Sequence, residues 1–138
     1  MSITPPSPRL LAAIALQIPD GLIYAGTDGN ILVWNDGAER IFGHSAAEAV
    51  GRSLDLIIPE AFRTAHHEGF RRAIASGRMR HAAGRVLTTR SMHKNGDRLY
   101  VDLSFGLIRD EAGAVIGVLA IARDCTAREL SARAARKS

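Results

Sequence analysis

The chain has 138 residues, of which 46% are hydrophobic and 23% charged, and its formal net charge is +4. This size allows one hydrophobic core, which excludes a chain of two full domains. No apolar run is long enough to span a membrane, and the basic residues form no aromatic-interleaved patch for single-stranded nucleic acid. The single Cys125 excludes an internal disulfide and a cysteine metal cluster. We therefore expect a cytoplasmic protein with neither a membrane nor a nucleic acid as a direct partner.

The first third of the chain predicts an arm, a helix and a hairpin. Residues 1–7 are rich in proline and are expected to form a flexible arm. A helix is expected from Pro8, because a proline suits the first turn of a helix. The Asp-Gly pair at 28–29 predicts a tight turn between strands at 22–25 and 31–34.

The rest of the chain predicts short helices, one longer helix, three strands and a final helix. Short helices are expected between residues 35 and 49, and the longer helix between Pro59 and Gly77. The three strands are expected over residues 81–92, 99–107 and 115–122. The order of these elements predicts an α+β fold, an antiparallel sheet with its helices inserted in the middle. We expect a domain over residues 8–125, with an outgoing helix or tail over residues 126–138.

The longer helix carries two adjacent histidines that differ in direction. Its interior stripe holds, at i, i+4 spacing, Phe62, His66, Phe70 and Ile74. His66 therefore faces the protein interior, where an imidazole must find a partner such as a metal or a carbonyl. His67 is rotated by about 100° from His66 and is expected on a solvated face.

The chain resembles the PAS family over about residues 10–130. The segments that carry this resemblance are Asp28-Gly29-Asn30-Ile31, Trp34-Asn35, Ala38-Glu39-Arg40-Ile41-Phe42-Gly43, Glu48-Ala49-Val50-Gly51, Lys94-Asn95-Gly96-Asp97 and Arg123-Asp124-Cys125-Thr126. The resemblance implies a five-stranded antiparallel sheet with short helices and one longer helix on one face, flanked by terminal helices. It also implies a sensory, dimerising module without catalytic activity, which forms a homodimer and signals to a separate output protein or domain.

Within this family, the segment from Arg63 to His66 resembles the Arg-x-x-His segment of haem-binding oxygen sensors. The resemblance implies that His66 is the metal ligand of a b-type haem and that the module senses a diatomic gas. The haem sensors carry an arginine or a methionine on the first strand after this helix, on the gas-binding side. Arg85 is expected in that role, although counting back from the turn at 95–96 puts Leu87 at the position of the arginine and Arg85 at that of the methionine. The cavity between the sheet and the helices would be lined by Leu87, Leu103 and Leu119.

Other interpretations of the same residues stay open. His66 is also explained as a core histidine bonded to a carbonyl or as a wall of a pocket for another small ligand. Arg85 is also explained by a salt bridge to Glu60 or Glu68. We do not expect zinc, because adjacent histidines on a helix point in different directions and no histidine follows at i, i+4. Light-sensing flavin chemistry is not expected either, because the helical middle contains no cysteine.

The competing function is a haem-free dimerisation or protein-interaction module. Its contact surface would be the apolar stripe of the first helix, formed by Leu11, Ile14 and Ile18. The sequence contains no glycine-rich phosphate loop, nucleophile elbow or supported pair of carboxylates, so we do not expect an enzyme.

Overall fold

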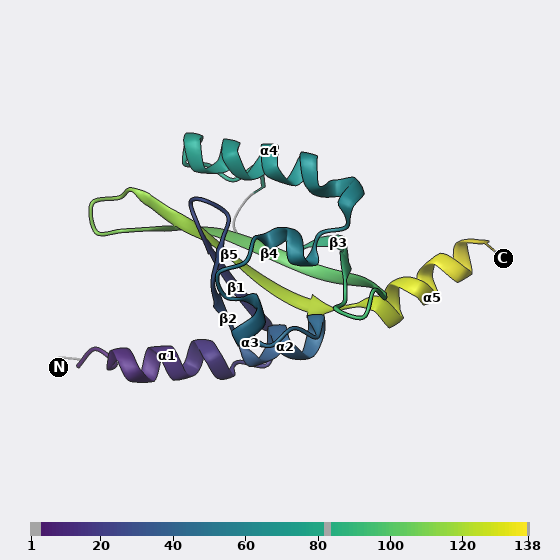
Figure 1. Ribbon diagram of the computed structural model, residues 1–138, viewed down its shortest axis with the longest axis horizontal. Coiled ribbons are helices and arrows are strands. Elements are labelled where there is room, and N and C mark those ends of the chain that lie inside the picture. The colour runs from purple at the N-terminus through teal and green to yellow at the C-terminus, as the bar shows by residue number, and fades with distance from the viewer. Residues whose placement is uncertain (1–3, 82–83, 138) are drawn as a thin grey trace.

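A five-stranded antiparallel sheet frames the protein in the computed structural model, which describes residues 4–81 and 84–137 (Figure 1). The strands are β1 (Gly21–Gly26), β2 (Ile31–Trp34), β3 (Leu87–Met92), β4 (Arg98–Arg109) and β5 (Val115–Asp124). Their spatial order is β2-β1-β5-β4-β3, so the N-terminal hairpin pairs with the last strand of the sheet. The predicted α+β class and antiparallel sheet are confirmed.

Helices connect and flank the strands of this sheet. They are α1 (Pro8–Gln17), α2 (Asp36–Phe42), α3 (Ala46–Ala49), the 3₁₀ helix η1 (Leu54–Ile57), α4 (Glu60–Ser76) and α5 (Thr126–Lys137). Figure 1 shows α4 above the sheet, α1 below it, and α5 leading away from it. The helix ends follow local sequence signals, such as the capping box of Ser45 and Glu48 and the left-handed Gly77 after α4.

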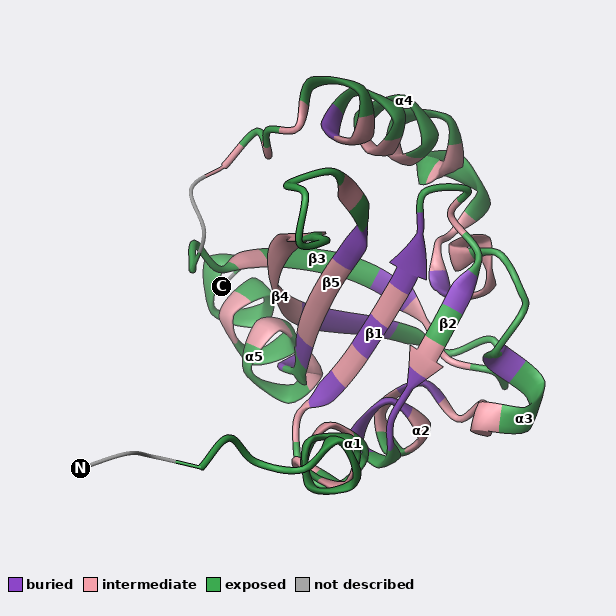
Figure 2. Cartoon of the chain, turned by 90° about the vertical axis from the view of Figure 1, so that its left-hand side faces the viewer, coloured by how far each residue is buried: buried purple, intermediate pink, exposed green. Residues whose placement is uncertain are grey.

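The packed core lies between the sheet and the short helices. Its largest fully buried apolar side chains are those of Trp34, Phe42, Ile31 and Val101. The indole nitrogen of Trp34 donates to the carbonyl of His44 at 2.9 Å, so this buried polar group is satisfied. Figure 2 shows that α1, α4 and α5 are mainly exposed, and Ala73 is the single buried position among the described residues of α4. The longest helix therefore stands apart from the tightly packed core.

The strand expected over residues 81–92 is wrong in its first half, because β3 begins at Leu87. Leu87 lies opposite Leu103, whereas β4 continues to Arg109 beside β5 alone. Gly84 has a φ of +85°, a left-handed conformation outside the range of extended strands. Residues 82–83 and 1–3, which fall within the expected strand and the expected arm, lie outside the described residues. The described part of the arm, residues 4–7, has neither helix nor strand.

A buried asparagine joins three elements of the N-terminal half. Asn35 is almost completely buried, and its Oδ1 accepts from the backbone N–H groups of Leu22 at 2.8 Å and Ala38 at 2.9 Å. Its Nδ2 donates to the backbone carbonyls of Ala15, Ile18 and Asp20. One side chain therefore fixes the end of α1, the start of β1 and the start of α2.

Asn35→Ala should lower the free energy of unfolding by about 2–4 kcal/mol, because it removes a helix cap and leaves buried backbone groups unpaired. Asn35→Asp should also destabilise, since a carboxylate oxygen would then face three carbonyl oxygens. Asn30→Ala, in the exposed turn between β1 and β2, is the matched control and should change stability by less than about 0.5 kcal/mol. Urea denaturation measures all three, and an Asn35→Ala variant as stable as Asn30→Ala would contradict this role.

A second polar cluster holds the first turn of α5 on β4. The hydroxyl of Thr126 donates to Asp124 at 2.6 Å and accepts from the backbone N–H of Tyr100 at 3.0 Å. Arg128 donates to both carboxylate oxygens of Asp102 at 2.9 Å, and the Thr88 hydroxyl donates to the same carboxylate at 2.7 Å. These bonds, from Arg128 above all, lower the pKa of Asp102 from 3.8 to about 2.

This pKa shift predicts how stability depends on acid. Because the pKa of Asp102 is lower in the folded protein than in the unfolded chain, its contribution is complete above pH 3.8 and is lost as the pH falls toward about 2. The free energy of unfolding should therefore fall over this interval, and Asp102→Asn should flatten the fall. Urea titrations across this range measure it, with Glu111→Gln in the β4–β5 turn as the control. Equal slopes for Asp102→Asn and the wild type would contradict the assignment.

Candidate functional site

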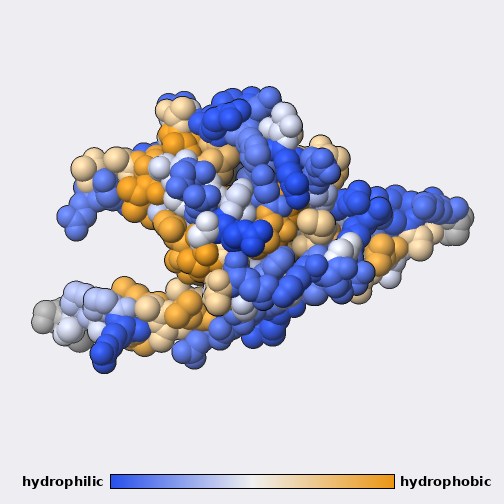
Figure 3. Space-filling view, viewed as in Figure 1, coloured by the Kyte–Doolittle hydropathy of each residue, from blue (hydrophilic) through white to orange (hydrophobic). Residues whose placement is uncertain are grey.

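A cavity of about 530 Å³ lies between α4 and the inner face of the sheet. Small side chains on both walls leave this space open. The sheet contributes Ala25 and Ala120, and α4 contributes Ala65 and Gly69, where an added Cβ would meet no atom within 4 Å. Figure 3 shows hydrophobic side chains beneath α4, where the helix stands over the body of the protein. The site is therefore an apolar, ligand-sized cavity.

His66 is the polar side chain that α4 presents to this cavity, together with Phe62 and Phe70 of the same stripe. Its Nδ1 is buried and has no hydrogen-bond partner among the described residues. Burial lowers the pKa of His66, and the neighbouring His67 lowers it further, against an opposing effect of Asp55. The imidazole is therefore held in its neutral form, which is the form that binds metals.

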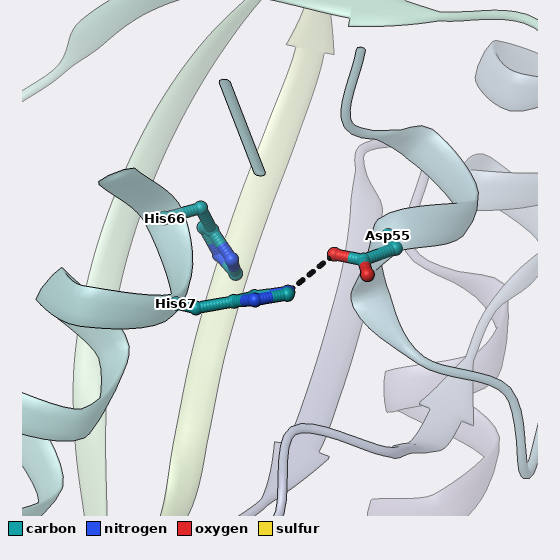
Figure 4. A group of neighbouring side chains, drawn as sticks. All are labelled: Asp55, His66 and His67. Carbon is teal, nitrogen blue, oxygen red and sulfur yellow. Dashed lines mark hydrogen bonds and ion pairs between the residues drawn. The ribbon is translucent and has the colours of Figure 1, made fainter. Parts of the chain in front are cut away.

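The neighbouring His67 is exposed, as expected, but it has a partner that the sequence did not indicate. Its Nε2 lies 2.7 Å from Oδ1 of Asp55 on η1, and the two side chains are 47% and 31% exposed (Figure 4). Arg63 holds η1 against α4, since its guanidinium donates to the backbone carbonyls of Ile58 at 2.9 Å and Asp55 at 3.3 Å. The arginine of the Arg-x-x-His segment thus has a structural role here.

The expectation that His66 and His67 cannot face one ion is wrong. One ligand atom from each histidine and one from Asp55 lie within 4.8 Å of one another. The ring of His67 extends toward η1, the ring of His66 lies beside it, and their planes meet at 66° (Figure 4). Asp55 was missed because the contact joins two elements. The sequence offered one indication of Asp55, namely a single acidic residue between Leu54 and Leu56 in a short apolar segment.

Four of the five predicted site residues lie on the cavity, namely His66, Arg85, Leu87 and Leu103. Leu119 does not. Val118 and Ala120 line the cavity, and because side chains alternate along a strand, Leu119 faces the opposite side of the sheet. The sequence could not settle this, because residues 115–122 are apolar at nearly every position and show no alternation.

Arg85 reaches the cavity from a different place than expected. It precedes β3 instead of lying on it, and it is exposed to solvent. The described residues contain no ion pair between Arg85 and Glu60 or Glu68. Arg80 and His81 also line the cavity, so the segment between α4 and β3 contributes both cationic and titratable side chains to its wall.

An antiparallel sheet of this strand order, with an apolar cavity under one helix, has the architecture of a sensory domain of signalling proteins. The PAS fold family matches residues 16–130, and the chain belongs to that family. Among the described residues, no helix has the length and apolar character needed to cross a membrane.

The chain is similar to parts of three much longer proteins. It is 32% identical over 116 residues to an uncharacterized protein of Azorhizobium caulinodans, covering 83% of this chain and 15% of that protein. It is 26% identical over 106 residues to the oxygen sensor protein DosP of Escherichia coli, covering 77% and 13%. It is 38% identical over 56 residues to the sensor protein FixL of Bradyrhizobium diazoefficiens, covering 41% and 11%.

Solved structures share the fold at lower identity. A PAS domain from Colwellia psychrerythraea superposes with a TM-score of 0.72 at 21% identity, covering 86% of this chain and 96% of that one. An RNA-binding light-oxygen-voltage receptor superposes with a TM-score of 0.70 at 22% identity, covering 93% and 38%. At these identities the likeness extends to the fold alone.

Proposed function

We propose that this PAS domain is a non-catalytic sensory module that binds a b-type haem through His66 and responds to a diatomic gas. The observation that carries the proposal is the neutral imidazole of His66, which borders an apolar cavity with one buried ring nitrogen unpaired. Similarity to an oxygen sensor over 77% of the chain supports the same function.

The residues around the cavity fit such a cofactor. A volume of about 530 Å³ lies within the usual range of ligand pockets, about 300–1,000 Å³. The walls are mainly apolar, as suits a flat hydrophobic ring system, and a histidine is a common axial ligand of haem iron. When bound, haem would supply an iron atom that coordinates a gas.

The cationic residues at one end of the cavity have a role in this proposal. Arg80 and Arg85 are exposed residues that also line the cavity, so their guanidinium groups can meet anionic carboxylates of a cofactor at its edge. We assign Arg85 to the gas-binding side and the packing of the ring to Leu87 and Leu103. Adduct-forming flavin chemistry is less well supported, because no cysteine is among the described residues that line the cavity.

The signal would leave through α5 to a separate output protein or domain. The strand β5 runs from the cavity wall at Val118 and Ala120 to Asp124, which bonds the first residue of α5. A shift of the cavity wall can therefore reach the outgoing helix along one strand. To act as a switch, it must bias two arrangements of the sheet and helix.

Purified protein reconstituted with haem should show the strong Soret absorption band of a histidine-ligated haem. His66→Ala should abolish this band or shift it, because the axial ligand is removed, and His67→Ala should keep it. Absorption spectra of the three proteins at equal haem content measure the effect.

Ala120→Phe should also weaken haem binding by filling the cavity, with Leu119→Phe on the opposite face as its control.

Two results would contradict the haem proposal. One is wild-type protein that stays colourless after reconstitution. The other is a His66→Ala variant whose spectrum matches the wild type while circular dichroism shows both to be folded.

The second candidate function is a haem-free dimerisation module, and the apolar surface of α1 favours it. Its exposed apolar side chains are between 46% and 52% accessible, and they are Leu10, Leu11, Ile14 and Leu16. Ile18 differs from them in being half-buried at the end of the helix. Figure 3 shows hydrophobic side chains in the hollow between α1 and the tip of the β4–β5 hairpin. We propose that a second copy of the chain covers this surface.

The double variant Leu11→Glu/Ile14→Glu should therefore convert a homodimer into a monomer of 14.8 kDa, since burying two carboxylates in an apolar contact is costly. Gln17→Glu, on the same helix, is the control and should remain dimeric. Light scattering coupled to size exclusion measures the masses. A wild type that is monomeric at every concentration would rule out the dimer, and a dimer without any haem binding would favour this second function.

A further inference from the structure

We propose that Asp55, His66 and His67 form a binding site for a divalent transition-metal ion, best matched by Zn²⁺. The three side chains each offer one ligand atom, and these atoms lie within 4.8 Å of one another. Two come from adjacent positions of α4 and the third from η1, which packs beside it (Figure 4). The site is separate in chemistry from a haem site, because it uses a carboxylate and a second imidazole.

The set of donors fits zinc. Imidazole nitrogen and carboxylate oxygen are usual Zn²⁺ ligands, and three protein ligands leave a fourth position for water. A tetrahedral ion with bonds of about 2.0–2.1 Å separates its ligand atoms by about 3.3 Å. The contact between His67 Nε2 and Asp55 Oδ1 is shorter than this, at 2.7 Å, and the widest separation is below 4.8 Å. Side-chain rotations that change these separations by about 1.5 Å or less would therefore bring all three atoms to bonding distance.

A second observation points to a ligand. The hydrogen bond between His67 and Asp55 is complete without His66, yet the ring of His66 lies beside these two side chains with its Nδ1 buried and unpaired among the described residues. An unpaired buried nitrogen lowers the stability of the fold, and coordination of a metal by the imidazole would bond this ring to the other two ligands through the ion. The neutral form of His66 already has the lone pair that a metal needs.

The segment that carries Asp55 is held in place by bonds that do not use its carboxylate. The backbone N–H of Asp55 donates to the hydroxyl of Ser53 at 3.1 Å, which fixes the start of η1. Arg63 of α4 donates to backbone carbonyls of this segment, and the Asp55 carboxylate bonds to His67. The ligands are thus set on two segments whose relative position is fixed by independent bonds.

Zinc and haem would exclude one another at His66. A neutral imidazole has one nitrogen with a free lone pair and one that carries a proton, so it binds one metal at a time. This consequence rests on the proposed haem function, whereas the zinc site itself does not. The domain would then respond to metal supply as well as to gas.

The test is a calorimetric titration of Zn²⁺ into tag-free, haem-free protein at neutral pH. The wild type should bind one Zn²⁺ per chain. Each of His66→Ala, His67→Ala and Asp55→Asn should weaken binding by at least about tenfold, because each removes a ligand. His93→Ala, in the β3–β4 hairpin, is the matched histidine control and should bind as the wild type does. Circular dichroism confirms that each variant is folded.

The outcomes separate this proposal from the haem proposal. Absence of Zn²⁺ binding by the wild type would overturn it, as would unchanged binding in both His67→Ala and Asp55→Asn. Those two variants should lose zinc and keep haem, whereas His66→Ala should lose both. Haem-loaded wild type should bind Zn²⁺ at least about tenfold more weakly than the haem-free protein. If the protein binds zinc but takes up no haem, the zinc site is supported, and only the proposed competition between zinc and haem at His66 is rejected.

Discussion

The neutral, half-buried imidazole of His66 is the constraint on which the rest of the site depends. A polar group that leaves water without a partner destabilises the fold by about 1–3 kcal/mol. Buried polar groups without a hydrogen-bond partner are therefore rare in native proteins, and each calls for a specific explanation such as a bound ligand or ion. Here the unpaired Nδ1 lies on an otherwise apolar cavity wall, on a helix that also carries the paired His67. This unpaired nitrogen is the observation that supports the proposed ligand-binding role of the ring.

The fold places this ring by separating tight packing from open space. Trp34 and Phe42 fill the region under the short helices, while alanine and glycine on the facing surfaces of α4 and the sheet leave the space between them unfilled. Arg63 then fixes η1 to α4, so the cavity has a rigid edge. The same sheet carries Asp102, which holds α5. The cavity and the outgoing helix therefore both contact the same sheet, as a sensory domain requires.

The sequence predicted what local chemistry determines. Turn glycines, helix caps and the interior direction of His66 follow from neighbours within a few residues, and these match the structure. The missed features depend on contacts between distant segments. β3 begins only at Leu87, after the left-handed Gly84, although β4 continues past its partner Leu103. The outward face of Leu119 depends on which side of a wholly apolar strand meets α4. The approach of Asp55 to two histidines depends on the packing of η1 against α4.

Nuclear magnetic resonance of the five histidine rings in the ligand-free protein tests the central claim most directly. Long-range nitrogen–proton spectra recorded across pH report the charge and pKa of each ring. We predict that burial lowers the pKa of His66, so that its ring takes up a proton only below its ordinary pKa of 6.5. A His66 ring that takes up its proton at or above pH 6.5 would show an exposed or paired imidazole and would contradict the account.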